Sequence, residues 1–487
     1  MIQDIRNLEP ENLWNKFADL NAVPRPSKKE DRVIQFMKNF GQNLGLETFE
    51  DEIRNVIIKK PATKGMESRK TVVLQGHLDM VHQKNNDTVF DFETQGIDMY
   101  VDGDWVRARG TTLGADNGLG VAMIMAILES ADIAHPAIEA LFTIDEETGM
   151  TGALNLKGGI LAGEILLNMD TEEDDEIDIG CAGGIDVTAN RNYELEPTPE
   201  DAVGYIITVK GLNGGHSGMD INKGLGNANK IMNRLLFDGF ENFGLQISEI
   251  NGGSLRNAIP RESNAKIIVA GIYDEQFVYE MQGIIKNIKS EYKTTEPNLI
   301  IEITKSELPA TVMDLGVQEG FIRGIYAAQN GVYRMSADME NLVETSNNIA
   351  RIVVSDGKIL IQNLTRSSVE SSKMDLANAL RSCYELFGCE VTFGGNYPGW
   401  TPNVNSEILD LLVSIYEKQN NEKPKVVACH AGLECGILGT NYPNMDMISF
   451  GPTIHGAHSP DERASIKSSQ KFYKFVVEIL ANIPERN

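Results

Sequence analysis

The chain has 487 residues, and its 44 Lys and Arg against 70 Asp and Glu give a formal net charge of −26 with histidine neutral. This length exceeds what one hydrophobic core normally supports, so we expect at least two domains. The acidic balance repels phosphate backbones and argues against a nucleic-acid-binding protein.

The cysteines and the apolar runs favour a protein of the cytoplasm. Five cysteines occur and none forms a Cys-x-x-Cys pair, which indicates free thiols in a reducing compartment. The N-terminal residues do not resemble a signal peptide, and no run of 18 apolar residues predicts a membrane span. We therefore expect a cytoplasmic protein that binds neither membranes nor nucleic acids.

The first part of the chain predicts strands that alternate with helices, which is typical of an α/β layer fold. Apolar strands are expected at 71–75, 137–144 and 164–169, and a strongly apolar helix at 118–129. Polar residues of metal-binding type follow the strands or precede the helix. Open α/β sheets bind ligands beyond the carboxyl ends of their strands, so the pattern predicts a site at that edge of a mixed, mostly parallel sheet.

The segment 185–395 has a different pattern, with amphipathic strands and helices typical of an α+β domain. The order of elements suggests two copies of a split β-α-β, ferredoxin-like unit, with predicted strands that include one around Asn257. A candidate ligand, His458, lies beyond this segment. We therefore predict an inserted lid domain at 185–395 and a discontinuous first domain formed by 1–184 and 396–487.

Five side chains that commonly bind divalent metals lie in short motifs at predicted strand ends or turns. They are His77 in Gly-His-Leu-Asp, Asp116 in Gly-Ala-Asp-Asn-Gly, Glu147 in Asp-Glu-Glu-Thr-Gly, Asp170 after Asn-Met, and His458 in His-Gly-Ala-His-Ser. Two imidazoles and three carboxylates suit a pair of divalent ions such as zinc. Two ions about 3.5–4 Å apart can hold an attacking water and polarise a carbonyl. The motifs therefore predict a two-metal hydrolase, in which Asp116 is suited to bridge both ions.

Two further carboxylates stand beside these candidates. Asp79 follows His77 by two residues and is suited to orient the imidazole through its second nitrogen. Glu146 precedes Glu147, and neighbouring side chains at a strand end point in different directions, so one can bind metal while the other faces the water. The structural alternatives are a cap or turn residue for Asp79 and an acidic surface pair for the two glutamates.

Candidates for substrate binding lie in the predicted insertion. His216, in Gly-Gly-His-Ser-Gly, is suited to donate to a developing oxyanion, and Arg366 is suited to hold a free carboxylate. Asn257 is a third candidate. The alternative for His216 is a structural loop histidine, and the alternative for Asn257 and Arg366 is hydrogen bonding within the fold. The acidic run 172–176 is interpreted as a solvated loop, with a role in the field near Asp170 as the alternative.

The motifs together resemble a known family. Gly-His-Leu-Asp-Met-Val at 76–81, Thr-Leu-Gly-Ala-Asp-Asn-Gly at 112–118 and Thr-Ile-Asp-Glu-Glu-Thr-Gly at 143–149 look like those of the aminoacylase/carnosinase-type metallopeptidases. Gly-Gly-His-Ser-Gly-Met-Asp-Ile at 214–221, Asn-Ala-Ile-Pro at 257–260 and His-Ala-Gly-Leu-Glu-Cys-Gly at 430–436 resemble their aminoacyl-histidine (Xaa-His) dipeptidase branch. The similarity spans nearly the whole chain.

The resemblance implies roles for individual residues. His77, Asp116 and Asp170 would hold one zinc, and Asp116, Glu147 and His458 the other, with Co²⁺ or Mn²⁺ as alternative ions. Asp79 would orient His77 and Glu146 would be the general base, while His216, Asn257, Arg366 and Gly432 would bind substrate. The family's acylases tend to carry Glu where Asp170 stands, so this chain falls on the dipeptidase side.

The implied activity is hydrolysis of Xaa-His and related small dipeptides by a homodimer. An alternative is a two-metal deacylase of N-acyl amino acids, which differs in not requiring a free substrate α-amine. A non-catalytic relative is the other alternative, and the complete ligand set with Glu146 argues against it.

Overall fold

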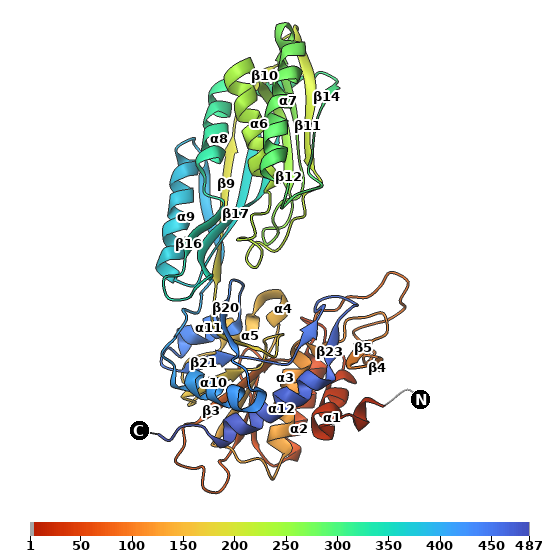
Figure 1. Ribbon diagram of the computed structural model, residues 1–487, viewed down its shortest axis with the longest axis vertical. Coiled ribbons are helices and arrows are strands. Elements are labelled where there is room, and N and C mark those ends of the chain that lie inside the picture. The colour runs from red at the N-terminus through yellow and green to blue at the C-terminus, as the bar shows by residue number, and fades with distance from the viewer. Residues whose placement is uncertain (1–3, 487) are drawn as a thin grey trace. The chain divides into compact units, whose positions relative to one another are not determined.

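The structure is a computed structural model that describes residues 4–486. The chain divides into two compact units. Unit 1 comprises Met1–Gly180, Trp400–Ala428 and Leu433–Asn487, and unit 2 comprises Cys181–Gly399 and Cys429–Gly432. In Figure 1 the ribbon of unit 1 is mainly red, orange and blue, and that of unit 2 runs from yellow to cyan. The first unit is thus assembled from segments far apart in the sequence.

Unit 1 contains an eight-stranded mixed sheet in the order β1-β2-β6-β3-β7-β21-β8-β20. The four central strands β6, β3, β7 and β21 run parallel, and the pairs β1–β2, β2–β6 and β21–β8 are antiparallel. The strand bounds are β1 Glu47–Glu50, β2 Val56–Lys60, β3 Val72–His77, β6 Ile138–Thr143, β7 Ile165–Asn168, β8 Glu176–Cys181, β20 Lys425–Cys429 and β21 Asp446–Ser449. Parallel central strands place their carboxyl ends along one edge, which is where the candidate ligands were predicted.

Helices and a small second sheet complete unit 1 (Figure 1). Helix α3 (Ala115–Glu129) is buried along almost its entire length, as its continuous apolar sequence predicts, and it packs against β3 and α1 (Glu11–Asn21). The remaining helices are α2 Asp31–Asn43, α4 Glu146–Gly149, α5 Thr151–Asn155, α10 Glu407–Asn420, α11 Glu434–Asn441 and α12 Ile466–Ala481, with the short η1 at Ile5–Asn7. The second sheet joins β4 Met99–Asp102, β5 Trp105–Ala108, β22 Ile454–His455 and β23 Arg463–Ser465.

Unit 2 is built on a nine-stranded sheet in the order β14-β11-β13-β12-β17-β18-β9-β19, with β16 paired to β17. The strand bounds are β9 Gly183–Asn192, β11 Ala202–Lys210, β12 Gln246–Gly253, β13 Ser263–Ala270, β14 Ile300–Ser306, β16 Gly331–Met335, β17 Val343–Ser355, β18 Lys358–Ser367 and β19 Glu390–Tyr397. Buried and half-exposed residues alternate along β9 and β11, so one face of the sheet carries the core.

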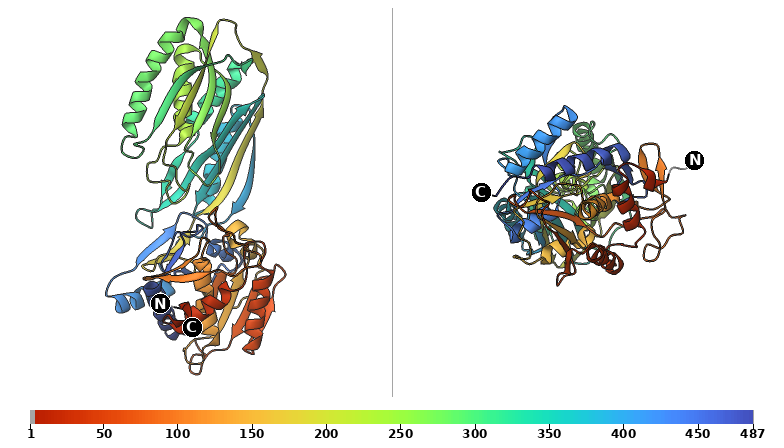
Figure 2. Two further views of the ribbon diagram at one scale, coloured as in Figure 1. Left: turned by 90° about the vertical axis from the view of Figure 1, so that its right-hand side faces the viewer. Right: turned by 90° about the horizontal axis from the view of Figure 1, so that it is seen from below.

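Four helices cover that face and share one hydrophobic core with it (Figure 2). They are α6 Ala228–Phe243, α7 Asp274–Glu291, α8 Leu315–Ala327 and α9 Glu370–Glu385; the short η2 (Gly271–Tyr273) precedes α7, and β10 Leu195–Pro197 pairs with β15 Thr311–Met313. In chain order, β11, β12, β13 and β14 form one group of strands, and β9, β17, β18 and β19 form another. Both groups have the sheet order fourth-first-third-second, and their second strands, β12 and β17, pair antiparallel.

The predicted fold class, an α/β domain with a mixed sheet and an α+β insertion, is confirmed. The strand predicted around Asn257 is wrong: the structure places a strand at β12 and puts residue 257 in the turn that follows it. The glycines at 252 and 253 made the sequence of β12 look less like a strand. Gly252 is required there because any side chain at this position would collide with Asn229. Among residues 4–486, no helix combines the length and apolar character needed to cross a membrane.

Candidate metal centre

All five predicted metal ligands lie in unit 1, at the carboxyl-end edge of its parallel strands. His77 is the last residue of β3, Glu147 lies in the short helix α4 that follows β6, and Asp170 follows β7 by two residues. Asp116 lies in the first turn of α3, where its backbone is not helical, and His458 lies in the loop between β22 and β23. The structure therefore brings together residues from five separate segments.

These residues form two groups that share Asp116. One ring nitrogen of His77, Nε2, lies 3.2 Å from Asp116 Oδ1 and 3.4 Å from Asp170 Oδ1. On the other side, His458 Nε2 lies 3.2 Å from Asp116 Oδ2 and 3.0 Å from Glu147 Oε2. Each group offers three ligand atoms within 4.8 Å of one another, a spacing that can hold a metal ion. The two oxygens of Asp116 thus face different groups.

The charges of the centre are strongly coupled to one another. Burial lowers the pKa of His77, but the carboxylates of Asp170 and Asp116 outweigh burial and raise that pKa well above its usual value. Hydrogen bonds to Asp116 and Glu147 raise the pKa of His458 to about 11. Burial raises the pKa of Glu147, and Asp116 adds to that rise. The carboxylates around His77 and His458 therefore favour positive charge at both histidines.

Asp79 connects the two strand ends at this centre. Its side chain is buried, and its carboxylate accepts hydrogen bonds from the backbone N–H groups of Glu146 (3.0 Å) and Glu147 (3.3 Å). Nδ1 of His77, the ring nitrogen that does not face Asp116, lies 3.2 Å from the main-chain carbonyl oxygen of Asp79 and 3.4 Å from its Oδ1. Asp79 therefore holds the imidazole and positions the turn that carries both glutamates.

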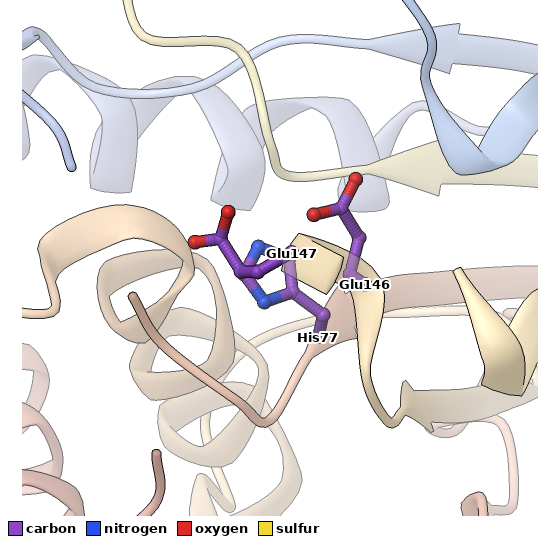
Figure 3. A group of neighbouring side chains, drawn as sticks. All are labelled: His77, Glu146 and Glu147. Atoms are coloured by element: carbon purple, nitrogen blue, oxygen red, sulfur yellow. The ribbon is translucent and has the colours of Figure 1, made fainter. Parts of the chain in front are cut away.

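In Figure 3 the carboxylates of the adjacent glutamates lie near the His77 ring, that of Glu147 to its left and that of Glu146 to its right, and an oxygen of each lies within 4.8 Å of the other. Each has a carboxylate oxygen within 4.8 Å of a ring nitrogen of His77. Glu147 belongs to the group with Asp116 and His458, whereas Glu146 does not. Burial raises the pKa of Glu146 well above its usual value, and the negative charge of Asp170 adds to the rise. Glu146 is thus a half-buried carboxyl group within 4.8 Å of His77 and Glu147 but outside both groups that share Asp116.

Sequence reasoning missed two buried residues that hold the turn bearing Asp116. The carboxylate of Glu462 accepts hydrogen bonds from four consecutive backbone N–H groups, at residues 113–116, over 2.7–3.3 Å. Arg25 donates to the carbonyl oxygens of Leu78, Asp79 and Gly114. Both side chains are buried. The only signal in the sequence was that Glu462 follows His458 by four residues.

The acidic run 172–176 is not the solvated loop that was predicted. All five of its residues are half-buried, Asp174 pairs with Lys471, and Asp175 pairs with Lys425. Burial raises the pKa of Glu172 to about 8, and the charge of Asp116 contributes to that rise. The prediction failed because it assumed that repulsion within the run drives it into solvent, whereas lysines distant in sequence offset that charge.

The predicted substrate-binding residues lie in unit 2. His216 and Arg366 are neighbours, with His216 Nε2 3.4 Å from Arg366 Nη2. Asn257 is exposed, and its carbonyl oxygen accepts a hydrogen bond from the N–H of Ser217. Gly432 follows His430, whose main-chain carbonyl lies against Gly218. The four predicted residues thus belong to neighbouring segments of one unit.

A model of the peptidase family M20/M25/M40 matches residues 73–482. The chain belongs to this family. It is 42% identical over 488 residues to the cytosol non-specific dipeptidase of Escherichia coli K12, and the match covers 100% of both chains. The resemblance predicted from the sequence motifs is therefore confirmed.

Two solved structures are similar to the structure of this chain. A crystal structure of aminoacylhistidine dipeptidase from Vibrio alginolyticus superposes with a TM-score of 0.94 at 42% identity, and the match covers 100% of this chain and 99% of that one. Aminopeptidase PepT from Bacillus cereus gives a TM-score of 0.57 at 16% identity, with 97% and 98% coverage, and shares the fold alone.

Proposed function

We propose that this M20 peptidase is a metal-dependent dipeptidase that hydrolyses Xaa-His and related dipeptides. The observation that carries the proposal is the position of Asp116, whose two oxygens lie 3.2 Å from Nε2 of His77 and 3.2 Å from Nε2 of His458. A single carboxylate between two ligand groups suits a pair of divalent cations. The names of the two relatives that are 42% identical over full length, both dipeptidases, support the choice of substrate class.

The residues present fit two divalent ions, for which zinc is our first choice and Co²⁺ or Mn²⁺ the alternatives. Glu147 Oε1 is buried and lacks a hydrogen-bond partner among the described residues, so the protein leaves a ligand atom available. We assign His77, Asp116 and Asp170 to one ion and Asp116, Glu147 and His458 to the other. When bound, such ions polarise a carbonyl group and lower the pKa of water.

Glu146 is our candidate for the general base. Its raised pKa lies closer to neutral pH than that of an ordinary glutamate. A carboxyl group with such a pKa can both accept a proton from the attacking water and return it to the leaving amine. Asp79 would act as a positioning residue, because it fixes the His77 ring and the backbone of both glutamates. This division separates proton transfer from metal binding within one Glu-Glu pair.

The His216–Arg366 pair supports a role in substrate binding. His216 Nδ1 accepts hydrogen bonds from the N–H groups of Gly218 and Met219, so its ring proton resides on Nε2. Burial and the Arg366 charge lower the pKa of His216, which keeps the ring neutral. Nε2–H and the guanidinium of Arg366 are both donors, so at 3.4 Å they do not satisfy each other. Two converging donors suit an oxygen of the substrate, either an oxyanion or the terminal carboxylate.

We further propose that unit 1 is the catalytic domain and unit 2 a lid that carries the substrate-binding residues, including Asn257 and Gly432. The repeated strand order of unit 2 supports a duplicated ferredoxin-like origin for it. The enzyme would be a homodimer. It would reside in the cytoplasm, in line with the name of its Escherichia coli relative, a cytosol dipeptidase.

The test is a substrate panel with zinc added and after chelation. It includes Xaa-His dipeptides and β-Ala-His beside N-acetyl amino acids. We expect metal-dependent hydrolysis of the dipeptides and little turnover of the N-acetyl compounds. Preferential hydrolysis of the N-acetyl amino acids would establish the alternative, a two-metal deacylase. Turnover that survives complete metal removal would contradict the proposal as a whole.

A further inference from the structure

A row of buried polar side chains crosses the central sheet of unit 1 just before the strands reach the candidate ligands. Gln75 on β3, Asn168 on β7 and Ser449 on β21 are neighbours in register, and Ser449 is also in register with Asp178 on β8. Gln75 precedes His77 by two residues, and Asn168 precedes Asp170 by two. Polar side chains at this depth need hydrogen-bond partners within the protein.

Those partners form a continuous chain with a carboxyl group at each end. Glu434, at the start of α11, lies 2.5 Å from Gln75 Nε2 and 2.7 Å from Thr143 Oγ1. At the far end, Asp178 Oδ2 lies 2.8 Å from Thr171 Oγ1. The intervening contacts are Gln75 Oε1 to Asn168 Nδ2 (2.5 Å), Asn168 Oδ1 to Ser449 Oγ (2.5 Å) and Ser449 Oγ to Thr171 Oγ1 (2.8 Å). All members of the row are buried.

Counting hydrogens shows that the row is one hydrogen short. Three contacts join Asn168 Oδ1, Ser449, Thr171 and Asp178, but the two hydroxyl groups supply only two hydrogens. The third hydrogen comes either from a protonated Asp178 or from the amide of Asn168 after it turns its nitrogen toward Ser449. In the second case the amide of Gln75 must turn as well, and its oxygen then faces Glu434 at 2.5 Å. That contact requires a protonated Glu434.

We propose that the row between Glu434 and Asp178 holds one proton for its two carboxyl groups and that all its hydrogen bonds point in one direction or all in the other. In one state Glu434 is anionic and Asp178 is a neutral acid, and in the other the roles are exchanged. Neither end changes its proton without a reversal of both amides and both central hydroxyl groups. This coupling goes beyond the proposed peptidase activity and does not depend on it.

The surroundings of both ends agree with a single shared proton. Burial raises the pKa of Asp178 to about 7, and Glu176 is the charged neighbour that adds to the rise. Burial raises the pKa of Glu434 to about 7, while the charges of His77, Asp170 and Asp79 act on it in opposite directions. A second charge in the row would be costly at this depth. A second proton on Glu434 Oε1 would find no hydrogen-bond acceptor, because this oxygen lacks a partner among the described residues.

The row therefore acts as a positioning device under the candidate metal centre. It ties β3, β7 and β21 together two residues before His77 and Asp170, and it holds one negative charge instead of two. Of its two ends, Glu434 is the one whose charge acts on His77. Cations at the candidate centre would favour the state in which Glu434 is charged and Asp178 is protonated.

The test counts neutral carboxylic acids in the metal-free protein by infrared difference spectroscopy at neutral pH, using the carbonyl band of the protonated acid. Two variants are compared with the parent chain: Ser449→Ala and the double variant Glu434→Gln/Asp178→Asn. Each should lose the band of one acid, because Ser449→Ala removes the contact that requires the extra hydrogen and the double variant removes both carboxyl groups.

Every other pattern overturns the proposal. Loss of two acids in the double variant would mean two independent neutral acids, and loss of none would mean two anions. An unchanged band in Ser449→Ala would show that burial, and not the row, protonates an end. Ser469→Ala, a buried serine whose hydroxyl donates to the carbonyl of Ser465 outside the row, is the matched control and should lose no band.

Because the readout is a proton count without metal, its failure would leave the dipeptidase proposal intact, and failure of the substrate panel would leave the row intact. Melting temperatures of the variants check that each is folded. We expect Ser449→Ala and Ser469→Ala to melt within about 5 °C of the parent, since each loses one hydroxyl group. A folded Ser449→Ala protein gives a valid count in either direction.

Discussion

The carboxylate of Glu462 accepts a hydrogen bond from the backbone N–H of Asp116 (3.3 Å), and from the three N–H groups before it. Glu462 therefore fixes the backbone turn that carries Asp116, the residue whose carboxylate faces both His77 and His458. Because it lies in the same loop as His458, it also joins the two halves of the second ligand group.

The first prediction follows from this contact. Glu462→Gln leaves one acceptor oxygen and adds an NH₂ group that opposes the N–H groups of the turn, so Asp116 should lose its fixed position. We expect zinc affinity to fall by about 10–100-fold, the usual effect of changing a residue that orients a ligand. Competition with a chelator measures this. Asp461→Asn, an exposed neighbour, is the control and should bind zinc normally. Unchanged affinity in Glu462→Gln would reduce Glu462 to a packing role.

The second prediction separates the two adjacent glutamates. Glu146→Gln should keep both metals and lose at least about 100-fold in turnover, because it removes the proposed base and no proposed ligand. Glu147→Gln is the matched comparison and should lose metal from one of the two sites. Elemental analysis with steady-state kinetics distinguishes them. High activity in a fully metallated Glu146→Gln enzyme would reject the assignment of the base.

The third prediction concerns the shared carboxylate. Asp116→Ala should lose metal at both sites, since one side chain serves two ions and offsets their mutual repulsion. Asp170→Ala should affect one site and retain the other. The measurement is the metal content after dialysis against metal-free buffer. Two metals retained by Asp116→Ala would mean that this residue only begins helix α3.

The sequence predicted the centre more completely than its supports, and the reason is physical. Each candidate ligand is a residue type with few other uses at a strand end, so His77, Glu147 and Asp170 stood out by position alone. Glu462 and Arg25 act through backbone groups of residues far away in the chain, and nothing local distinguishes them from surface charges. Gln75 and Asn168 were hidden for a similar reason: their role depends on strand neighbours that only the sheet order reveals.

The fold shows the same limit. The long apolar helix α3 was predicted within a few residues, because a continuous run of helix-forming apolar residues is a local signal. The strand predicted at Asn257 failed because β12 ends in two glycines and is defined by its partners β13 and β17. The local composition of a strand does not reveal which distant strand it pairs with.

The fourth prediction tests His216. His216→Ala should lower turnover by about 100–1,000-fold, the usual effect of removing an oxyanion donor, while both metals stay bound and the melting temperature hardly changes. Arg366→Lys should raise KM more than it lowers kcat if Arg366 holds the substrate's carboxylate, since lysine keeps the charge but loses the fork geometry. Near-normal turnover in a folded His216→Ala enzyme would limit this histidine to a structural role in its loop.

The fifth prediction uses His430, a buried residue of unit 2 whose Nε2 lies 2.8 Å from Ser346 Oγ. Burial and the nearby Arg366 charge lower the pKa of His430 from 6.5 to about 3. The folded state therefore keeps the ring neutral at pH values where the unfolded chain binds a proton, and stability contributed by the neutral ring is present above pH 6.5 and is lost as the pH falls. At pH 5 the loss amounts to about 2 kcal/mol. Calorimetry of the parent and His430→Gln at pH 7.5 and pH 5 should show a smaller decline in the melting temperature for the variant, because glutamine does not titrate. Equal declines in both proteins would mean that His430 takes up its proton in the folded state.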